Sequence, residues 1–274
     1  MSDRFNCLPI NHPDATALVG VVLQAAVAIK KHYEKSAQVH YKPGNEPVTD
    51  ADREADDIIV SFLKKQFPFD AVLSEENGLF VPDKVNERIW FIDPIDGTKE
   101  FIAKNGEFAV QIGLTNSGKL ELGVVYQVAL DRLYIAAAGQ GSWFRSENSS
   151  WQQLHVAKNH ESLVMAVSRS NPSNVGNEIA QQLGASKIAC GSVGLKFMQI
   201  AHQKAHFYVN SSNDTKAWDL AAPELLLKEA GGEVTDLSGN EFVYDLKGYV
   251  HRNGIFASYN KLLHKQILGL HNNS

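Results

Sequence analysis

One stretch, from Trp90 to Phe101, constrains this chain more than any other, because it reads W-F-I-D-P-I-D-G-T-K-E-F. The apolar run from Ile89 to Ile92 predicts a buried strand, and an acid, a proline, a second acid and a glycine follow it closely. Proline fixes one backbone angle and glycine permits an unusual one, so the turn can aim the carboxylates of Asp93 and Asp96 at one point. Two carboxylates at the carboxyl end of a strand suit a hard divalent cation.

Thr98 follows this turn and is predicted to begin a short helical stretch. The free backbone N–H groups and the positive end of the dipole at a helix start favour a phosphate group. An acid pair beside such a helix start is the arrangement of a metal-dependent phosphatase. The alternative for any single Asp-Gly pair is a hairpin turn preceded by an unrelated aspartate, but the residues flanking Asp96-Gly97 disfavour it here.

A second phosphatase class, the haloacid dehalogenase type, carries D-x-D-G-T after a hydrophobic strand and uses the first aspartate as a covalent nucleophile. This chain has D-P-I-D-G-T, which is one residue longer and places the two acids in a different relation. A covalent aspartyl-phosphate intermediate is therefore disfavoured.

Charge and cysteine content narrow the classes of function. The chain has 26 basic and 31 acidic residues, a net charge of −5 and no basic run, so we expect no binding to a nucleic-acid polymer. Two cysteines, Cys7 and Cys190, are too few for a disulfide framework, and we expect a cytoplasmic location. The apolar stretch from Ala17 to Ile29 is interrupted by Gln24 and is too short to span a membrane, so we predict a core helix and no integral membrane association.

Secondary-structure signals divide the 274 residues into two halves. Residues 1–150 combine helices with an antiparallel meander and contain most of the candidate metal ligands, and the polar segment from Ser146 to Gln153 is the expected boundary. Residues 151–274 alternate strands with helices and complete the metal and substrate site. The pattern predicts an α/β half packed on an α+β half.

Acids lie at the predicted ends of separate elements, namely Asp52, Glu75, Asp93, Asp96 and Asp219. Mg²⁺ prefers oxygen ligands, and a pair of such ions can stabilise the charge that develops on a transferred phosphoryl group. The alternative for some of these acids is helix capping, since Thr49-x-x-Asp52 matches a capping box. Capping and catalysis can coexist at Asp52.

Four sequence blocks, in this order, resemble the inositol monophosphatase superfamily, which also contains fructose bisphosphatases and 3'(2'),5'-bisphosphate nucleotidases. The blocks are P-V-T-D-A-D from Pro47, L-S-E-E from Leu73, the stretch from Trp90 to Phe101, and W-D from Trp218 with the A-A and G-G pairs after it. The resemblance spans most of the chain. It implies a layered αβαβα sandwich of the inositol monophosphatase and fructose bisphosphatase type.

The resemblance also implies the cofactor and the roles of the site residues. Two or three Mg²⁺ ions would be bound by Glu75, Asp93, Asp96, Asp219 and the carbonyl of Ile95. Glu76 is the alternative to Glu75, and Thr98, paired with Asp52, would orient the attacking water. Substrate contacts are expected from Gly97, Thr98, Lys99, Ser192, Lys196 and Asp219. Lithium is expected to inhibit by taking a magnesium position.

Within the superfamily, the residues after Thr98 resemble the bisphosphate nucleotidases of the CysQ type. The similar blocks are K-E-F-I directly after Thr98, N-G-E-F from Asn105, and G-S with L-K-F from Gly191, where Gly194 is inserted relative to the pattern. A Lys196 ammonium near a second phosphate would favour a bisphosphorylated nucleotide over a monophosphorylated polyol. The alternative for Lys196 is a solvated helix lysine.

The sequence therefore predicts a Mg²⁺-dependent phosphatase that hydrolyses the 3'-phosphate of adenosine 3',5'-bisphosphate, or of its sulfated form, with a metal-activated water. The alternatives are an inositol monophosphatase or broad sugar phosphatase on the same scaffold, and a noncatalytic binding protein that kept the fold. We expect a small phosphorylated partner and a monomer or homodimer. His202 and His206 lack a nearby third zinc ligand and are predicted to be ordinary surface or interface residues.

Overall fold

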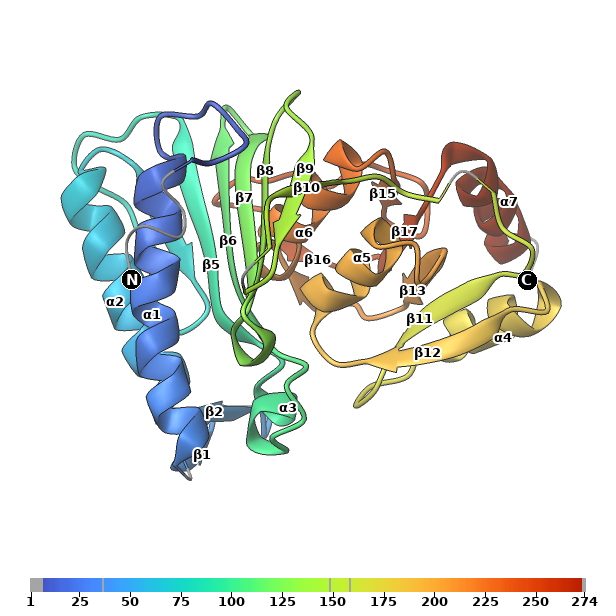
Figure 1. Ribbon diagram of the computed structural model, residues 1–274, viewed down its shortest axis with the longest axis horizontal. Coiled ribbons are helices and arrows are strands. Elements are labelled where there is room, and N and C mark those ends of the chain that lie inside the picture. Colours follow the sequence, from blue (N-terminus) through green and yellow to red (C-terminus); the bar gives the residue numbers. More distant parts are fainter. Residues whose placement is uncertain (1–6, 36, 148, 158, 273–274) are drawn as a thin grey trace.

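The computed structural model describes residues 7–35, 37–147, 149–157 and 159–272. Helices and sheets alternate in five layers across the molecule (Figure 1). This arrangement confirms the layered αβαβα sandwich predicted from the sequence, with each sheet covered on both faces by helices.

The first helical layer consists of α1 (Ala15–Glu34) and α2 (Asp50–Gln66), which pack on each other and on the first sheet. Helix α1 is long and apolar enough to cross a membrane by length and composition alone. Its face of Leu18, Val22, Ala25 and Ile29 is nevertheless fully buried in the core. This burial confirms the core helix predicted there.

The first sheet has eight strands in the order β10-β9-β8-β7-β6-β5-β3-β4. Their bounds are β3 (Ala71–Ser74), β4 (Gly78–Phe80), β5 (Arg88–Asp96), β6 (Ala109–Asn116), β7 (Lys119–Gln127), β8 (Arg132–Ala137), β9 (Ser142–Arg145) and β10 (Gln152–Leu154). Strand β3 runs parallel to β5. Strands β6, β7 and β8 form the predicted antiparallel meander, which β5 extends on one side and β9 and β10 extend on the other. Strand β10 lies just beyond residue 150, and the division into two domains stays a prediction.

Strand β5 is longer than the run from Ile89 to Ile92 that the sequence predicted, because it continues through the acid turn to Asp96. Its pairing with β6 is regular up to Asp93 and becomes irregular between Asp93 and Asp96. Pro94 lies in this interval and has no N–H to donate to a neighbouring strand. The two acids therefore flank an irregularity within a buried strand and do not form a turn after it.

The second sheet has the order β12-β11-β13-β17-β15. Its strands are β11 (Val164–Ser168), β12 (Ser186–Cys190), β13 (Phe207–Asn210), β15 (Glu233–Thr235) and β17 (Ile255–Ser258). Helices α5 (Val193–Ala201) and α6 (Ala217–Glu229) lie between the two sheets, and α4 (Asn174–Gln182) and α7 (Lys261–Asn272) form the outer layer. Two small two-stranded sheets pair β1 (Val39–Tyr41) with β2 (Pro47–Thr49), and β14 (Thr215–Lys216) with β16 (Val250–His251).

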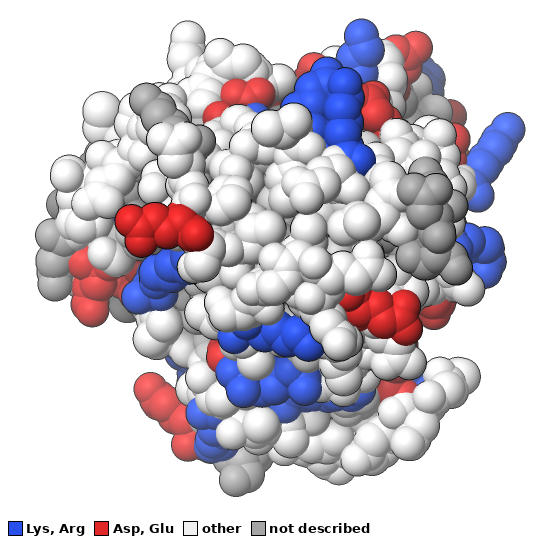
Figure 2. All heavy atoms as spheres, turned by 90° about the vertical axis from the view of Figure 1, so that its right-hand side faces the viewer, with Lys and Arg blue, Asp and Glu red and all other residues white. Residues whose placement is uncertain are grey.

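Lys and Arg side chains on the face formed by the outer helices stand in separate groups, with acidic and neutral residues between them (Figure 2). A nucleic-acid polymer needs a continuous basic track to neutralise its phosphates. Among its described residues, this face offers no such track.

Helix α6 packs unusually close to the first sheet at Gly113 of β6. A Cβ atom added to Gly113 would lie 2.6 Å from the Cβ of Ala221 and 2.9 Å from the backbone nitrogen of Ala222. Gly123 on β7 faces the same turn of the helix, and a Cβ atom added to it would lie 3.1 Å from the carbonyl oxygen of Ala222. The pairing of glycines with alanines lets α6 approach the sheet and fixes the helix start, where Asp219 lies.

We expect Gly113→Ala to lower the free energy of unfolding by about 1–3 kcal/mol, because backbone atoms must move to admit the methyl group. Urea unfolding measures the change. Gly20→Ala is the matched control, since no atom lies within 4 Å of the Cβ position in helix α1 and alanine favours a helix. Equal stability of Gly113→Ala and wild type would contradict the close packing of α6.

Candidate active site

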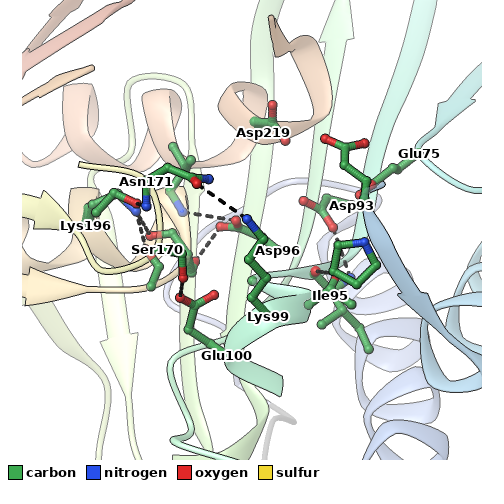
Figure 3. A pocket seen from close by; sticks show the side chains of 18 residues that line it. Glu75, Asp93, Ile95, Asp96, Lys99, Glu100, Ser170, Asn171, Lys196 and Asp219 are labelled. Atoms are coloured by element: carbon green, nitrogen blue, oxygen red, sulfur yellow. Dashed lines mark hydrogen bonds between the residues drawn. The ribbon is translucent and has the colours of Figure 1, made fainter. Parts of the chain in front are cut away.

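The predicted site residues come together at one pocket of about 250 Å³ between the two halves of the chain (Figure 3). All of them except Asp52 line its wall. The first half supplies the strand ends and the short helix α3 (Thr98–Ile102), and the second half supplies the starts of α5 and α6. Carboxylates that are far apart in the sequence therefore converge on one cavity.

Asp93 and Gly97 owe their positions to the backbone of the D-P-I-D-G-T segment. The carboxylate of Asp93 is buried and accepts the N–H of Ile95 at 3.0 Å. Gly97 has a φ of 101°, and an added Cβ would lie 2.9 Å from the carbonyl oxygen of Glu107. Only glycine fits this position without strain.

The carboxylate of Asp96 is held by the beginning of helix α5. Its Oδ1 accepts the N–H of Val193 at 3.0 Å, and its Oδ2 accepts the N–H of Gly194 at 2.8 Å and the hydroxyl of Ser192. Gly194, the residue inserted relative to the CysQ-type pattern, thus contacts a candidate metal ligand. Burial raises the pKa of Asp96, while the Lys196 charge and these hydrogen bonds oppose the rise.

Ser192 lines the pocket, but its hydroxyl is engaged on the protein side. It donates to Asp96 and accepts the N–H of Leu195 at 3.0 Å, as the N-cap of helix α5. The predicted contact of Ser192 with substrate stays a prediction.

Lys196 is buried, with 2% of its surface exposed, so the alternative of a solvated helix lysine is wrong. Its ammonium donates to the carbonyl oxygens of Ser192, at 2.9 Å, and of Gly191, and it lies 5.3 Å above the ring of Tyr208. Burial lowers the pKa of Lys196, and the Asp96 charge opposes this. The ammonium lies beside the pocket wall, and its predicted contact with a second phosphate stays a prediction.

Glu75 and Glu76 share the ammonium of Lys42, a residue that the sequence analysis did not single out. Lys42 Nζ lies 2.8 Å from Glu75 Oε1 and 2.5 Å from Glu76 Oε1. Burial raises the pKa of Glu76 to about 7, although Lys42 opposes the rise. Glu75 lines both the pocket and a neighbouring cavity, whereas Glu76 lines the neighbouring cavity and not the pocket, which fits Glu75 as the candidate ligand. A lysine in a Pro-Gly loop carries no local sequence signal for this contact.

Asp219 joins the cluster from the first turn of helix α6, where its Oδ2 accepts the N–H of Lys216 at 2.7 Å. Burial, and after it the charge of Glu75, raises the pKa of both Asp93 and Asp219 well above the ordinary value. Such mutual repulsion in a buried set of oxygen ligands is the environment that a hard divalent cation relieves.

The donor chemistry therefore fits Mg²⁺. In the described part of the chain, no three His, Cys, Asp or Glu side chains form a group tight enough to hold a metal. The ammonium of Lys42 also engages Glu75.

Thr98 and Asp52 are in direct contact, as the resemblance implied. Thr98 Oγ1 donates to Asp52 Oδ1 at 3.0 Å and lies 3.3 Å from the carbonyl oxygen of Ile95. The other oxygen of Asp52 accepts the N–H of Thr49 at 2.8 Å and its hydroxyl at 2.5 Å, which completes the predicted capping box. Burial raises the pKa of Asp52, and these hydrogen bonds oppose the rise. Capping and the contact with Thr98 thus coexist in one carboxylate.

Two further contacts cross the pocket between α3 and the loop after β11 (Figure 3). Ser170 donates its hydroxyl to Glu100 at 2.5 Å, and Lys99 Nζ lies 3.4 Å from Asn171 Oδ1. Sequence reasoning missed Ser170 and Asn171, because small polar residues in a loop carry no signal of the element that they face.

His202 and His206 are more buried than predicted. His206 is buried, and its Nδ1 accepts the N–H of Val164 at 3.0 Å. His202 is half-buried and lies 3.2 Å from the hydroxyl of Tyr134. The prediction of surface or interface residues is therefore wrong for His206, which is buried directly before β13, while the half-buried His202 lies at the C-cap of helix α5.

Asp56 makes the stability of the metal-free chain depend on pH. It is fully buried, accepts the hydroxyl of Ser74 and the N–H of Asn77, and burial raises its pKa to about 6. A carboxyl with a raised pKa in the folded state contributes stability below its unfolded pKa, near 4, and this stability is lost as the pH rises through the folded value.

We expect the free energy of unfolding in EDTA to be higher at pH 5 than at pH 8. Asp56→Asn should reduce that difference by about 1.4 kcal/mol, because only about one pH unit separates pH 5 from the folded pKa of about 6. Urea unfolding at a series of pH values measures it. Asp83→Asn, an exposed acid in the loop after β4, is the control and should leave the pH dependence unchanged. A pH dependence in Asp56→Asn equal to that of wild type would contradict the assignment.

A layered αβαβα sandwich with carboxylates of both halves around one pocket defines the phosphatase class built on this fold. The chain belongs to the inositol monophosphatase family, whose family model matches residues 11–273. The family model thus covers both halves of the site.

Different relatives of this chain carry different functional names. The chain is 38% identical over 224 residues to the 3'(2'),5'-bisphosphate nucleotidase CysQ of Escherichia coli K12, covering 80% of this chain and 89% of that protein. It is 31% identical over 237 residues to the Nus factor SuhB of Vibrio cholerae, covering 83% and 86%. Among solved structures, the extragenic suppressor protein SuhB of Bartonella henselae superposes with a TM-score of 0.80 at 25% identity, covering 95% and 98% of the two chains. The relatives establish a phosphatase family and leave its substrate open.

Proposed function

We propose that this chain is a Mg²⁺-dependent phosphatase that removes the 3'-phosphate of adenosine 3',5'-bisphosphate, giving AMP and inorganic phosphate. One observation carries the proposal: carboxylates of both halves converge on the pocket that also receives Thr98. The similarity to the CysQ nucleotidase of Escherichia coli supports the choice of substrate.

The proposed ligands of two or three Mg²⁺ ions are Glu75, Asp93, Asp96, Asp219 and the carbonyl of Ile95. When bound, Mg²⁺ supplies positive charge for the developing phosphoryl charge and lowers the pKa of a nearby water. Asp52 fixes the direction of the Thr98 hydroxyl, which orients the attacking water and passes its proton toward the buried carboxylate. The water oxygen forms the new bond to phosphorus, the bond from phosphorus to O3' breaks, and O3' takes up a proton that balances the one released by the attacking water.

The rest of the substrate would contact the opposite wall of the pocket. Lys99 and Asn171 lie at the pocket wall on the two elements that face each other there, and both present polar groups to a nucleotide. We propose that Lys99 contacts the second phosphate, with Gly97 and Thr98 along the phosphate being hydrolysed. Ser192 and Lys196 of helix α5 and its N-cap, and Asp219 of helix α6, would supply the remaining contacts with the substrate.

An inositol monophosphatase or broad sugar phosphatase is the second candidate, and one observation favours it. The ammonium of Lys196 is occupied by two backbone carbonyls, so the group expected to read a second phosphate is already engaged. A noncatalytic binding protein is disfavoured, because every proposed ligand is present in the sequence.

We further propose a cytoplasmic location and a chain that works as a monomer or homodimer. Cys7 and Cys190 are both free, which suits a reducing compartment. The two halves, 1–150 and 151–274, would act as one unit, because the pocket needs residues of both.

A phosphate-release assay tests the proposal with adenosine 3',5'-bisphosphate, its sulfated form and inositol 1-phosphate as substrates. We expect kcat/KM for the bisphosphate nucleotides to exceed that for inositol 1-phosphate by about 100-fold, since an unmatched buried polar site rejects a substrate strongly. EDTA should abolish release, Mg²⁺ should restore it, and Li⁺ should inhibit. A preference for inositol 1-phosphate would transfer the proposal to the second candidate.

A further inference from the structure

Glu107, in the N-G-E-F block, lies between the two turns that build the site. Its carbonyl oxygen is 2.9 Å from the Cβ position of Gly97 in the first half and 2.6 Å from that of Gly191 in the second. The N–H of Glu107 donates to Asn105 Oδ1 at 2.9 Å, which fixes the backbone of this segment. The two glycines therefore allow Glu107 to touch both halves of the site at once.

The carboxylate of Glu107 makes three charged or polar contacts with the second half. Arg169 donates to both of its oxygens, from Nε at 2.7 Å and from Nη2 at 2.6 Å, and Gly191 donates its N–H at 2.8 Å. Arg169 Nη2 also lies 3.2 Å from the carbonyl oxygen of Ala189 at the end of β12. This fork-like pairing holds the polypeptide on both sides of Cys190 against the first half.

The turn that Glu107 holds is the same turn that holds Asp96. Directly after Gly191, the next three residues, 192–194, give Asp96 its three hydrogen bonds. Contacts thus run without a break from Arg169 and Glu107 to a candidate metal ligand. Neither Glu107 nor Arg169 is among the described residues that line the pocket, so neither side chain contacts a molecule bound there.

We propose that Glu107 and Arg169 form a clasp that positions the 190–194 turn, and through it the carboxylate of Asp96. The clasp is a positioning device and not a stability device. Its side chains are 24% and 45% exposed, and ion pairs of that exposure contribute little to the free energy of unfolding. Groups that orient a metal ligand nevertheless change metal affinity or activity by about 10- to 100-fold when removed.

Hydrogen exchange of the full-length, metal-free protein tests the positioning directly. The informative amides are those of Val193 and Gly194, because they bond to Asp96 and make no contact with the clasp itself. We expect Glu107→Ala and Arg169→Ala each to speed their exchange by about 10-fold. Glu107→Gln retains an acceptor for Gly191 and should be intermediate.

A matched control lies on β12, the strand that leads into the 190–194 turn. Lys187 of β12 donates to Asn177 at 2.7 Å, away from the turn, so Lys187→Ala should leave the exchange of Val193 and Gly194 unchanged. Thermal unfolding of all variants should stay within a few degrees of wild type, because the clasp is exposed.

Two functional readouts follow, and they depend on the proposed function. Mn²⁺ affinity, measured by titration calorimetry without substrate, and kcat/KM for phosphate release should both fall about 10-fold in Glu107→Ala and in Arg169→Ala. The double variant should lose no more Mn²⁺ affinity and no more activity than either single variant, because both changes open the same clasp.

The outcomes separate the clasp from the proposed function. Unchanged exchange of Val193 and Gly194 in both single variants overturns the clasp, whatever the activity does. Faster exchange with unchanged Mn²⁺ affinity overturns the claim that the clasp positions Asp96, and faster exchange throughout the chain shows general destabilisation and overturns it as well. A wild type that releases phosphate from no substrate defeats the proposed function, while the exchange of the two amides still decides whether the clasp exists.

Discussion

Asp93→Asn is expected to abolish phosphate release while the protein keeps its fold. The asparagine retains an oxygen that can accept the N–H of Ile95, but it removes a negative charge from the centre of the carboxylate cluster. If the cluster holds the cations that stabilise the transition state, several kcal/mol are lost, and kcat falls by about 1,000-fold. Phosphate release at saturating substrate and Mg²⁺ measures the effect.

Stability gives the same substitution a second, independent readout. The pKa of Asp93 is raised by burial and by neighbouring acids, so its charge destabilises the metal-free fold. We therefore expect Asp93→Asn to unfold in EDTA at a temperature equal to or above that of wild type, and to lose the stabilisation that Mg²⁺ gives the wild type. Asp57→Asn, outside the pocket, is the control for both assays. Activity that survives Asp93→Asn would show that the metal assignment is wrong.

The sequence could predict the elements and the converging acids because local rules place them. The helix from Asp50 begins where the Thr49 capping box puts it, and the meander follows the alternation of apolar residues. Asp93 lies within β5 beside the irregularity at Pro94, and Asp219 lies in the first turn of α6; both positions depend mainly on nearby residues. Their shared pocket follows from the layered fold, which the resemblance implied.

Contacts between distant side chains could not be predicted in this way. Lys42 reaches Glu75 and Glu76 only because the β1–β2 hairpin folds over the end of β3, and no spacing in the sequence encodes that approach. Lys196 seemed as suited to solvent as to substrate, since a lysine in a helix is usually exposed. Its burial depends on the position of α5 between two sheets, which is a property of the whole fold.

Thr98→Ala is expected to lower kcat by about 100- to 10,000-fold, the range over which a positioned proton acceptor or donor acts. The hydroxyl of Thr98 is the group that Asp52 orients at 3.0 Å, and alanine leaves the buried Asp52 Oδ1 without that donor. Thr98→Ser keeps the hydroxyl and should keep most of the activity. Phosphate release from the same substrate, with equal Mg²⁺, compares the three proteins.

Asp52→Asn distinguishes orientation from capping, because Asp52 serves both. Loss of the capping box should lower the free energy of unfolding by about 1 kcal/mol, whereas loss of the proton acceptor should lower kcat as much as Thr98→Ala does. If the two residues act as one unit, the double variant Asp52→Asn with Thr98→Ala should be no slower than either single variant. Losses in kcat that multiply would instead mean that Thr98 and Asp52 act separately, and that the water is oriented by another group.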